Sequence, residues 1–276
     1  MIRKKIIIVA LLGIFTSCAA QKKEKISGDR DVISVTHQID QPFNGISVGN
    51  DFEVKIKQSQ RNSYILTADK NLVDIVTFKV KDSILHIETT QRITSSKRLE
   101  IYLNVDKIDK IELKNEVELK SDGPLESNNM VISGYDDSNF ELDLTVEKLG
   151  MNLQGKSSGE IAGNAKNFDV FMNDRSELEA ELETEIVTIN LQKRADLDLE
   201  GTAEDATINM AGNSRLKARE FEIENSEITL IDKAEADLQV EETLTIYAKD
   251  KSVLNSYGKA ELKTTLSGDV TLNKKS

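Results

Sequence analysis

The chain is dominated by an aliphatic position that recurs about every twenty residues. Successive members of this column are separated by 21, 21, 17, 19, 19, 20 and 18 residues: Ile111, Ile132, Leu153, Val170, Ile189, Ile208, Ile228 and Ile246. A fixed period of this length is typical of a solenoid, in which each repeat is one coil stacked on its neighbours. The period therefore predicts a repeat architecture for most of the chain.

Three further columns accompany the first. Two residues later comes a second inward position: Leu113, Gly134, Gly155, Met172, Leu191, Met210, Leu230 and Ala248. Six residues after the first column comes a small residue in seven of the eight repeats: Ser138, Gly159, Ser176, Ala195, Ser214, Ala234 and Ser252. Two residues further comes an apolar one: Leu119, Phe140, Ile161, Leu178, Leu197, Leu216, Ala236 and Leu254. We expect the small residues to mark a corner of each coil.

The apolar residues alternate with polar ones inside each repeat, as in Thr188-Ile189-Asn190-Leu191. Alternation of period two places one set of side chains in a core and the other in water, which favours β-strands. Asn, Asp and Gly at the corners tolerate the bent backbone there. These features predict an all-β fold, a single-stranded right-handed parallel β-helix with coils of about 19–21 residues. An antiparallel β-sandwich is the alternative fold.

The region from 32 to 105 is rich in β-strand signals but less regular. Its expected strands are 32–36, 45–48, 52–57, 64–67, 77–80, 84–88 and 99–105, with one helical turn at 72–76. Because the end of a stack exposes core residues and unpaired strand edges, we expect this region to begin and cap the solenoid. No Pro- or Gly-rich linker separates it from the coils, so residues 32–276 are expected to form one domain.

The first residues have the pattern of an export signal. Arg3, Lys4 and Lys5 precede a ten-residue apolar run that is too short to span a bilayer. Small residues before Cys18, the only cysteine in the chain, resemble a bacterial lipobox. We therefore expect a signal peptide at 1–17, a lipid attached to Cys18, and a polar tether at 18–31. Ordinary secretory cleavage near Ala19 or Ala20 is the alternative.

The net charge excludes one class of partner. The formal charge is −12, and it becomes −15 when Arg3, Lys4 and Lys5 are removed with the signal peptide. Nucleic-acid binding requires a basic surface, so we expect no nucleic-acid partner. The expected location is the cell envelope, where the protein would be an outer-membrane lipoprotein. The sequence does not indicate whether it faces the periplasm or the cell surface.

The N-terminal region also resembles a known family. The residues that carry the resemblance are Phe43-Asn44-Gly45-Ile46-Ser47-Val48, Phe52-Glu53-Val54-Lys55-Ile56, Ala68-Asp69-Lys70-Asn71-Leu72 and Ile84-Leu85-His86-Ile87. They are similar to the auto-transporter adhesin head, or GIN, domain found in lipoproteins of Bacteroidetes-type bacteria. The resemblance implies a right-handed β-helix in the cell envelope and no catalytic residues. This chain departs from the family at its coil turns, which read Asp-Lys, Asp-Arg or Gly-Asn in place of Gly-Ser-Gly.

No pattern of residues indicates catalysis or a cofactor. The two histidines, His37 and His86, have no neighbouring cysteine or histidine at metal-ligand spacing. The chain has no tryptophan on which a sugar ring could stack. We therefore expect a noncatalytic, adhesin-like envelope module without metal or cofactor. The alternative is a carbohydrate-active enzyme, of the polysaccharide lyase or glycosidase type, that uses one side of the β-helix as a groove.

Acidic residues beside the corners form the one candidate binding patch. If the coils stack in register, five carboxylates should share an outward patch: Glu160, Glu177, Glu179, Asp196 and Asp198. Such a patch would suit a divalent cation or a basic partner. Arg215 and Lys217 follow in the same columns, and this favours a structural role in which charges on neighbouring strands balance one another.

Overall fold

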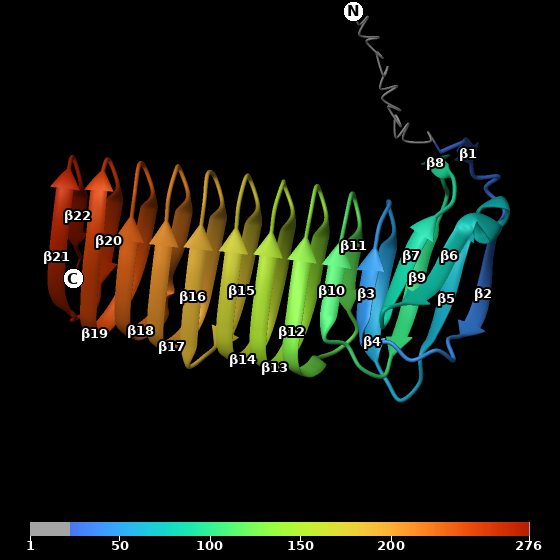
Figure 1. The fold of residues 1–276 in the computed structure, drawn as a ribbon, viewed down its shortest axis with the longest axis horizontal. Helices are drawn as coiled ribbons and strands as arrows, with labels where there is room; N and C mark the ends of the chain where they lie inside the picture. The colour runs from blue at the N-terminus through green and yellow to red at the C-terminus, as the bar shows by residue number, and fades with distance from the viewer. Residues whose placement is uncertain (1–22, 276) are drawn as a thin grey trace, which may run out of the picture.

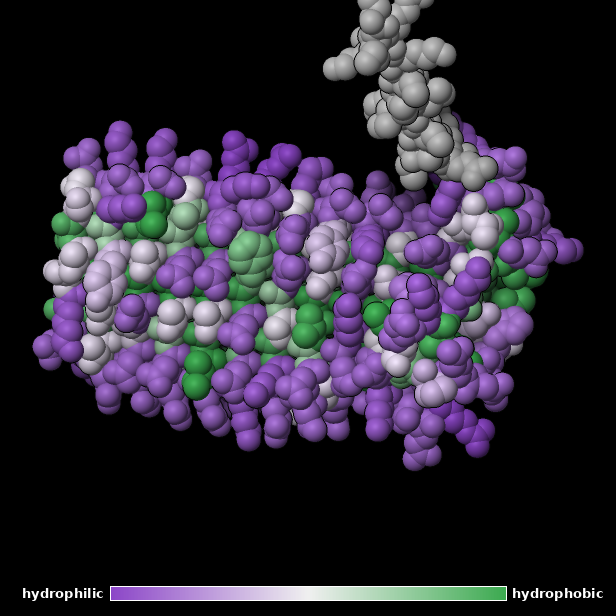
Figure 2. Space-filling model, viewed as in Figure 1, coloured by the Kyte–Doolittle hydropathy of each residue, from purple (hydrophilic) through white to green (hydrophobic). Residues whose placement is uncertain are grey.

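The computed structural model describes residues 23–275 as a β-solenoid with a β-rich cap at its N-terminal end (Figure 1). Hydrophilic side chains cover the upper and lower margins of the solenoid in the same view (Figure 2). The cap region contains nine strands and one short 3-10 helix: β1 (Lys25–Ser27), β2 (Val32–Gln38), β3 (Gly45–Val48), β4 (Glu53–Gln58), β5 (Ser63–Asp69), η1 (Lys70–Ile75), β6 (Val76–Lys81), β7 (Ile84–Thr89), β8 (Arg92–Ser95) and β9 (Leu99–Val105). Every strand expected between 32 and 105 is present with bounds within two residues, and the expected helical turn is η1.

The remaining strands build the coils. They are β10 (Lys110–Leu113), β11 (Glu118–Ser121), β12 (Leu125–Gly134), β13 (Asn139–Leu153), β14 (Ser158–Met172), β15 (Glu177–Glu183), β16 (Ile186–Leu191), β17 (Asp196–Met210), β18 (Arg215–Leu230), β19 (Glu235–Asp250), β20 (Val253–Tyr257), β21 (Glu261–Gly268) and β22 (Thr271–Lys274). All their mutual pairings are parallel, for example Ile189 with Ile208 and Ile208 with Ile228. The solenoid of about nine turns over 110–274 is thereby confirmed, and the sandwich is excluded.

Each coil is flat, with two long sides joined by two edges. One edge, which we call the corner edge, is a tight turn whose bent residue has positive φ in every coil: Asn50, Asn115, Asp136, Gly155, Asp174, Lys193, Gly212, Asp232, Asp250 and Gly268. Asn, Asp and Gly adopt this backbone most easily, and Lys193 is the exception. The opposite edge, the bend edge, is where a strand such as β14 passes from one side to the other.

The corner serines and alanines are buried because space is short. Ser138, Ser157 and Ser214 are at most 1% exposed, and their hydroxyls have no hydrogen-bond partner among the described residues. Ala195 and Ala234 occupy the same place in other coils. At two other corners the hydroxyls of Ser176 and Ser252 each donate to a backbone carbonyl at 3.0 Å, so small size, and not an unpaired hydroxyl, is what these serine and alanine corners share.

One coil has a different register from the one expected. Met151, not Leu153, pairs with Ile132 and Val170 in the first column, while Leu153 pairs with Gly134 and Met172 in the second. The corner residue of that coil is accordingly Ser157, and Gly159 takes the place that was assigned to Ile161. A shift by two residues keeps every inward side chain inward, so alternation alone could not detect it.

The cap contains the first coil of the solenoid. Strands β3 and β4 pair in parallel with β10 and β11, so they form a coil that precedes the regular ones. The chain then returns over this coil, and β7 and β9 pair on its outer side. Beyond them the antiparallel strands β2, β5 and β6 end the parallel stack. This arrangement covers the N-terminal end of the core, as the expected cap should.

The expected tether contributes a strand to the cap. Residues 1–22 and 276 lie outside the described residues, but β1, within 18–31, pairs in parallel with β8 of the cap. Among the described residues no helix is long and apolar enough to cross a membrane.

Candidate functional site

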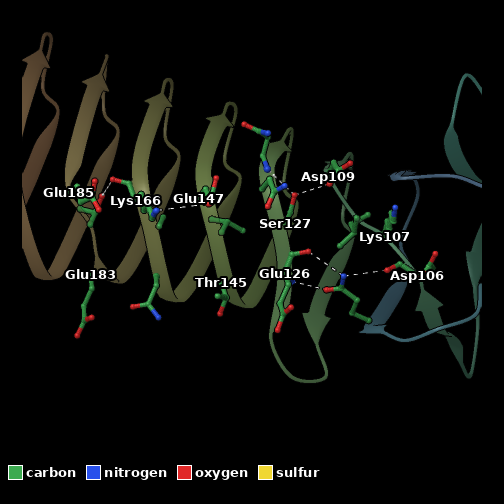
Figure 3. Close-up of a pocket in the computed structure, with 18 of the residues that line it drawn as sticks. Asp106, Lys107, Asp109, Glu126, Ser127, Thr145, Glu147, Lys166, Glu183 and Glu185 are labelled. Atoms are coloured by element: carbon green, nitrogen blue, oxygen red, sulfur yellow. Dashed lines mark hydrogen bonds and ion pairs between the residues drawn. The ribbon is translucent and has the colours of Figure 1, made fainter.

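A groove runs along the bend edge of the solenoid. It has a volume of about 1130 Å³ and runs from Gln58 across successive coils to Thr202. Figure 3 shows Glu147, Lys166 and Glu185 in one row along the coils, with Glu126, Thr145 and Glu183 in a second row. Because parallel coils stack at ~4.8 Å, each row repeats its hydrogen-bonding groups at that spacing.

The end of the groove nearest the cap is held by Gln58. Its Oε1 accepts a hydrogen bond from the Glu126 backbone N–H at 2.7 Å, and its Nε2 donates to the carbonyls of Glu126 at 3.2 Å and Asp106 at 3.4 Å. The Ser127 hydroxyl donates a hydrogen bond to the Asp109 carboxylate, which also lines the groove, at 2.8 Å. These contacts tie the cap to the first regular coils and fix the shape of the groove there.

The middle of the groove is polar, and some of its side chains form ion pairs or hydrogen bonds. The Lys166 ammonium lies 4.0 Å from Glu147, and both side chains are about 60% exposed. The Thr184 hydroxyl donates to the carbonyls of Lys166 at 3.0 Å and Ile186 at 3.2 Å. The lining therefore presents amides, hydroxyls and carboxylates to solvent, above a floor of buried apolar residues such as Val146 and Ala165.

The groove is lined by polar and aliphatic side chains, several of them carboxylates. Of the described residues that line the groove, none is aromatic, cysteine or histidine. Within residues 23–275 no three acidic, histidine or cysteine side chains are arranged to hold a metal ion. Rows of donors and acceptors at a regular spacing can contact an extended chain that lies along the solenoid axis. The sequence analysis did not predict this groove, because no regular apolar column marks the bend residues. The recurring Thr and Asn residues at 145, 164, 184 and 202 were the only pattern that could have indicated it.

The five carboxylates of the expected patch lie on one side of the solenoid, which we call the acidic face. Glu177 pairs with Asp196, and Glu179 pairs with Asp198, as expected. Glu160 instead pairs with Glu141 and Glu179, because Ser158 holds the position beside Glu177. Glu160 therefore lies in the column of Glu179 and Asp198, not in the predicted column of Glu177 and Asp196, for the same reason as the shift in core register.

Neighbouring cations pair with carboxylates at both ends of the acidic face, Lys120 with Glu141 at one end and Arg215 and Lys217 with Asp196 and Asp198 at the other. Arg215 lies 3.6 Å from Asp196 and 3.8 Å from Glu235, and Lys217 lies 3.3 Å from Asp198. Burial lowers the pKa of Lys217, but its hydrogen bond to Asp198 and the charge of Asp196 outweigh this and raise the pKa above its ordinary value. Glu160, Glu177 and Glu179 form no ion pair with any described residue.

Arg215→Glu should destabilise the solenoid modestly. The substitution replaces two opposite-charge contacts, to Asp196 and Glu235, by like-charge ones, each worth ~0.2–1 kcal/mol. We expect the free energy of unfolding to fall by about 1 kcal/mol in low salt and by less in high salt, where screening is stronger. Chemical denaturation at two salt concentrations measures this. Lys233→Glu, which changes the charge equally at an exposed corner without a described ion pair, is the control.

Thermal unfolding in the presence of Ca²⁺ tests whether the acidic face binds a divalent cation. If its role is structural, millimolar Ca²⁺ should leave the melting temperature nearly unchanged. A rise of several degrees that is lost in Glu177→Gln/Asp196→Asn would instead identify a metal site.

The remaining expected residues lie elsewhere. Cys18 is outside the described residues. His37 is exposed on the cap with its ring 5.3 Å from that of Tyr64, and His86 is half-buried on β7. Neither histidine lines the groove.

A comparison with known protein families identifies the family of this chain. The family described as "Putative auto-transporter adhesin, head GIN domain" matches residues 42–192 and 167–260, which together cover most of the chain. The chain belongs to the GIN domain family. The resemblance seen in the N-terminal residues is thereby confirmed.

Solved structures share the fold of this GIN domain. A protein titled putative adhesin from Parabacteroides distasonis matches at a TM-score of 0.69 and 16% identity, over 91% of this chain and 99% of that one. A protein titled putative lipid binding protein, from the same species, matches at 0.67 and 16%, over 92% and 100%. A putative adhesin from Parabacteroides merdae matches at 0.66 and 16%, over 91% and 98%. At such low identity these matches establish the fold alone. A comparison with curated proteins finds no significant match.

Proposed function

We propose that this GIN domain is a noncatalytic binding module of the cell envelope, anchored by a lipid on Cys18, that holds an extended polymer along its bend-edge groove. The observation that carries the proposal is the groove itself. It crosses successive coils and presents rows of amides, hydroxyls and carboxylates at a regular spacing. Membership in an adhesin family agrees with an exported protein that binds rather than reacts.

A hydroxyl-rich, neutral glycan fits this lining best. Hydroxyl groups can both donate to the carboxylates and accept from Lys166 and the amides of Asn129 and Asn164. A strongly anionic polymer would meet the exposed carboxylates of Glu126, Glu183 and Glu185 and be repelled. The absence of aromatic lining residues among those described predicts weak binding per sugar, offset by the length of the groove.

Binding can be tested with the neutral polysaccharides dextran, mannan and xylan. We expect saturable binding of at least one of them in affinity electrophoresis, and loss of most of that binding in Asn164→Trp, which fills the groove from an exposed position. Glu181→Trp, an exposed position of the acidic face, is the matched control and should bind normally. Equal binding by both variants would place the ligand elsewhere. Release of new reducing ends would favour the enzymatic alternative.

The anchor is tested separately. If Cys18 is acylated, the chain should partition into detergent and incorporate a fatty-acid analogue in cells, and Cys18→Ala should abolish both. Incorporation that persists in Cys18→Ala would show that the lipid, if any, is carried elsewhere.

A further inference from the structure

One side of the solenoid carries a stripe without charged side chains, although the chain as a whole is 30% charged. This side is formed by strands such as β12 and β16 and faces the viewer in Figures 1 and 2. Two adjacent outward columns beside the corner edge make up the stripe, and we call them the neutral stripe. The first column is Ser133, Asn152, Phe171, Asn190, Asn209, Thr229 and Tyr247. The second, two residues later in each coil, is Tyr135, Gln154, Asn173, Gln192, Ala211 and Ile231.

The opposite side shows that this neutrality is not a general property of the surface. There, one outward column of the acidic face carries a charge in every successive coil: Glu141, Glu160, Glu179, Asp198, Lys217 and Asp237. The column that adjoins the neutral stripe is charged only at Asp169 and Glu227 between Val131 and Thr245. Charged side chains would keep either side in water equally well, so the neutral stripe departs from the pattern of this surface for another reason.

The neutral stripe combines amides with aromatic rings. Asn209 Nδ2 donates a hydrogen bond to Asn190 Oδ1 at 3.3 Å, so amides of neighbouring coils form a ladder. An amide side chain has two donor hydrogens and an acceptor oxygen with two lone pairs, and each member of the ladder therefore keeps further groups for a ligand. In the same column Tyr247 is 44% exposed and Phe171 is half-buried. These two rings lie four coils apart, a distance of ~19 Å at the spacing of stacked strands.

We propose that the neutral stripe is a second binding surface, separate from the bend-edge groove, which lies flat on a packed, insoluble polysaccharide of neutral sugars. A sugar ring has hydroxyl groups around its rim and C–H groups on its faces, so it can bond to amides and stack on aromatic rings. No charge has to be desolvated when an uncharged stripe meets an uncharged polymer. The coils stack in a straight row, so the stripe can contact many sugars of an ordered surface at once (Figure 1).

A single polymer chain and a second copy of this protein fit the stripe less well. The stripe lies on the outside of a sheet, so it would cover a single chain from one side only, whereas the bend-edge groove can take a chain between its rows. Two copies joined through their stripes would bring together two chains with a formal charge of −12 each, and these repel one another. The two surfaces therefore differ in ligand: an ordered polymer surface for the stripe and a single chain for the groove.

Adsorption of the full chain, in detergent, to particles of cellulose, chitin and insoluble starch tests this assignment. We expect saturable adsorption to at least one of them. Phe171→Ser/Tyr247→Ser should weaken that adsorption about tenfold, because the sugars lose both rings on which they stack. Tyr102→Ser/Tyr257→Ser is the matched control: it removes two half-buried outward rings from the opposite side and should adsorb normally.

Removal of amides is a second measure of the same contact. Asn190→Ala/Asn209→Ala should weaken adsorption about threefold, because the sugar hydroxyls lose hydrogen-bond partners. Asn139→Ala/Asn255→Ala removes two outward amides from the opposite side and should not weaken it. Circular dichroism checks that each variant is folded.

Further outcomes distinguish the stripe from the groove and from contacts between copies. Asn164→Trp, which fills the groove, should leave adsorption to the particles unchanged, and a loss would assign the particles to the groove and overturn the stripe. Adsorption to none of the three particles, or equal adsorption by the two ring-removing double variants, would also overturn the stripe and would leave the groove as proposed. A dimer in sedimentation that Phe171→Ser/Tyr247→Ser dissociates would make the stripe a contact between copies and overturn its assignment to a polysaccharide.

Discussion

Ile208→Asp should unfold the middle of the solenoid. Ile208 is 1% exposed and stacks between Ile189 and Ile228 in the core column. A carboxylate there would be buried without a described partner of opposite charge. We expect a loss of more than ~4 kcal/mol, because an unpaired buried charge is among the most destabilising changes. Since each coil contacts only its neighbours, the loss should centre on the coils around position 208.

Thr207→Asp is the matched control for this substitution. Thr207 is the preceding residue of the same strand, but its side chain is exposed on the outer side of the sheet. It should change the melting temperature by only a few degrees in circular dichroism. Limited proteolysis should cut Ile208→Asp first within β16–β18. If the two variants melted alike, the assignment of inward and outward faces would be wrong.

Gly159→Leu should be nearly as damaging, for a steric reason. A Cβ atom on Gly159 would lie 2.2 Å from Cε2 and Cζ of Phe140, whose ring fills the space that a side chain at 159 would need. Phe140 is 1% exposed, so its ring is enclosed by the core and cannot move aside into solvent. Overpacking of a dense core costs about 1–3 kcal/mol, and we expect the upper end of that range or more here.

The double variant Phe140→Leu/Gly159→Leu should recover much of the loss. It makes this part of the column leucine throughout, as in the neighbouring coils at Leu119, Leu178 and Leu197. Phe140→Leu alone should be destabilising, because it leaves a void above Gly159. Denaturant unfolding of the four proteins gives the coupling energy, which we expect to exceed ~1 kcal/mol. Additive losses would mean that Phe140 and Gly159 do not share the same space.

The pairing of Phe140 with Gly159 also explains where sequence reasoning failed. A phenylalanine followed one coil later by a glycine breaks the simple column, and the alignment by aliphatic residues therefore passed over Gly159 to Ile161. The next aliphatic residue is two positions away on the same face, so the error is invisible to the alternation of apolar and polar residues. Only the contact of the ring with the following coil shows the true register.

The bend edge needs glycine for a different reason, the close approach of the backbone of the preceding coil. Gly163 and Gly201 alternate with Leu144 and Leu182 in one column, and a Cβ on Gly163 would lie 1.9 Å from the Leu144 carbonyl oxygen. Both glycines have positive φ, at 133° and 118°. These glycines let the chain turn beneath the groove, yet in the sequence they are isolated and carry no periodic signal.

The sequence by itself determined the repeat, the β-character of each coil, the small residue at its corner and the existence of an irregular N-terminal cap. Those properties follow from local alternation and from residue size, which repeat along the chain. The tertiary structure alone decided the register of the coil at Met151, the placement of β3 and β4 as a first coil beneath the cap, and the groove along the bend edge. Each of these depends on which side chain of one coil stacks on a side chain of the next, and the length of chain between stacked positions varies, from 19 residues between Ile132 and Met151 to 65 between Ile46 and Ile111.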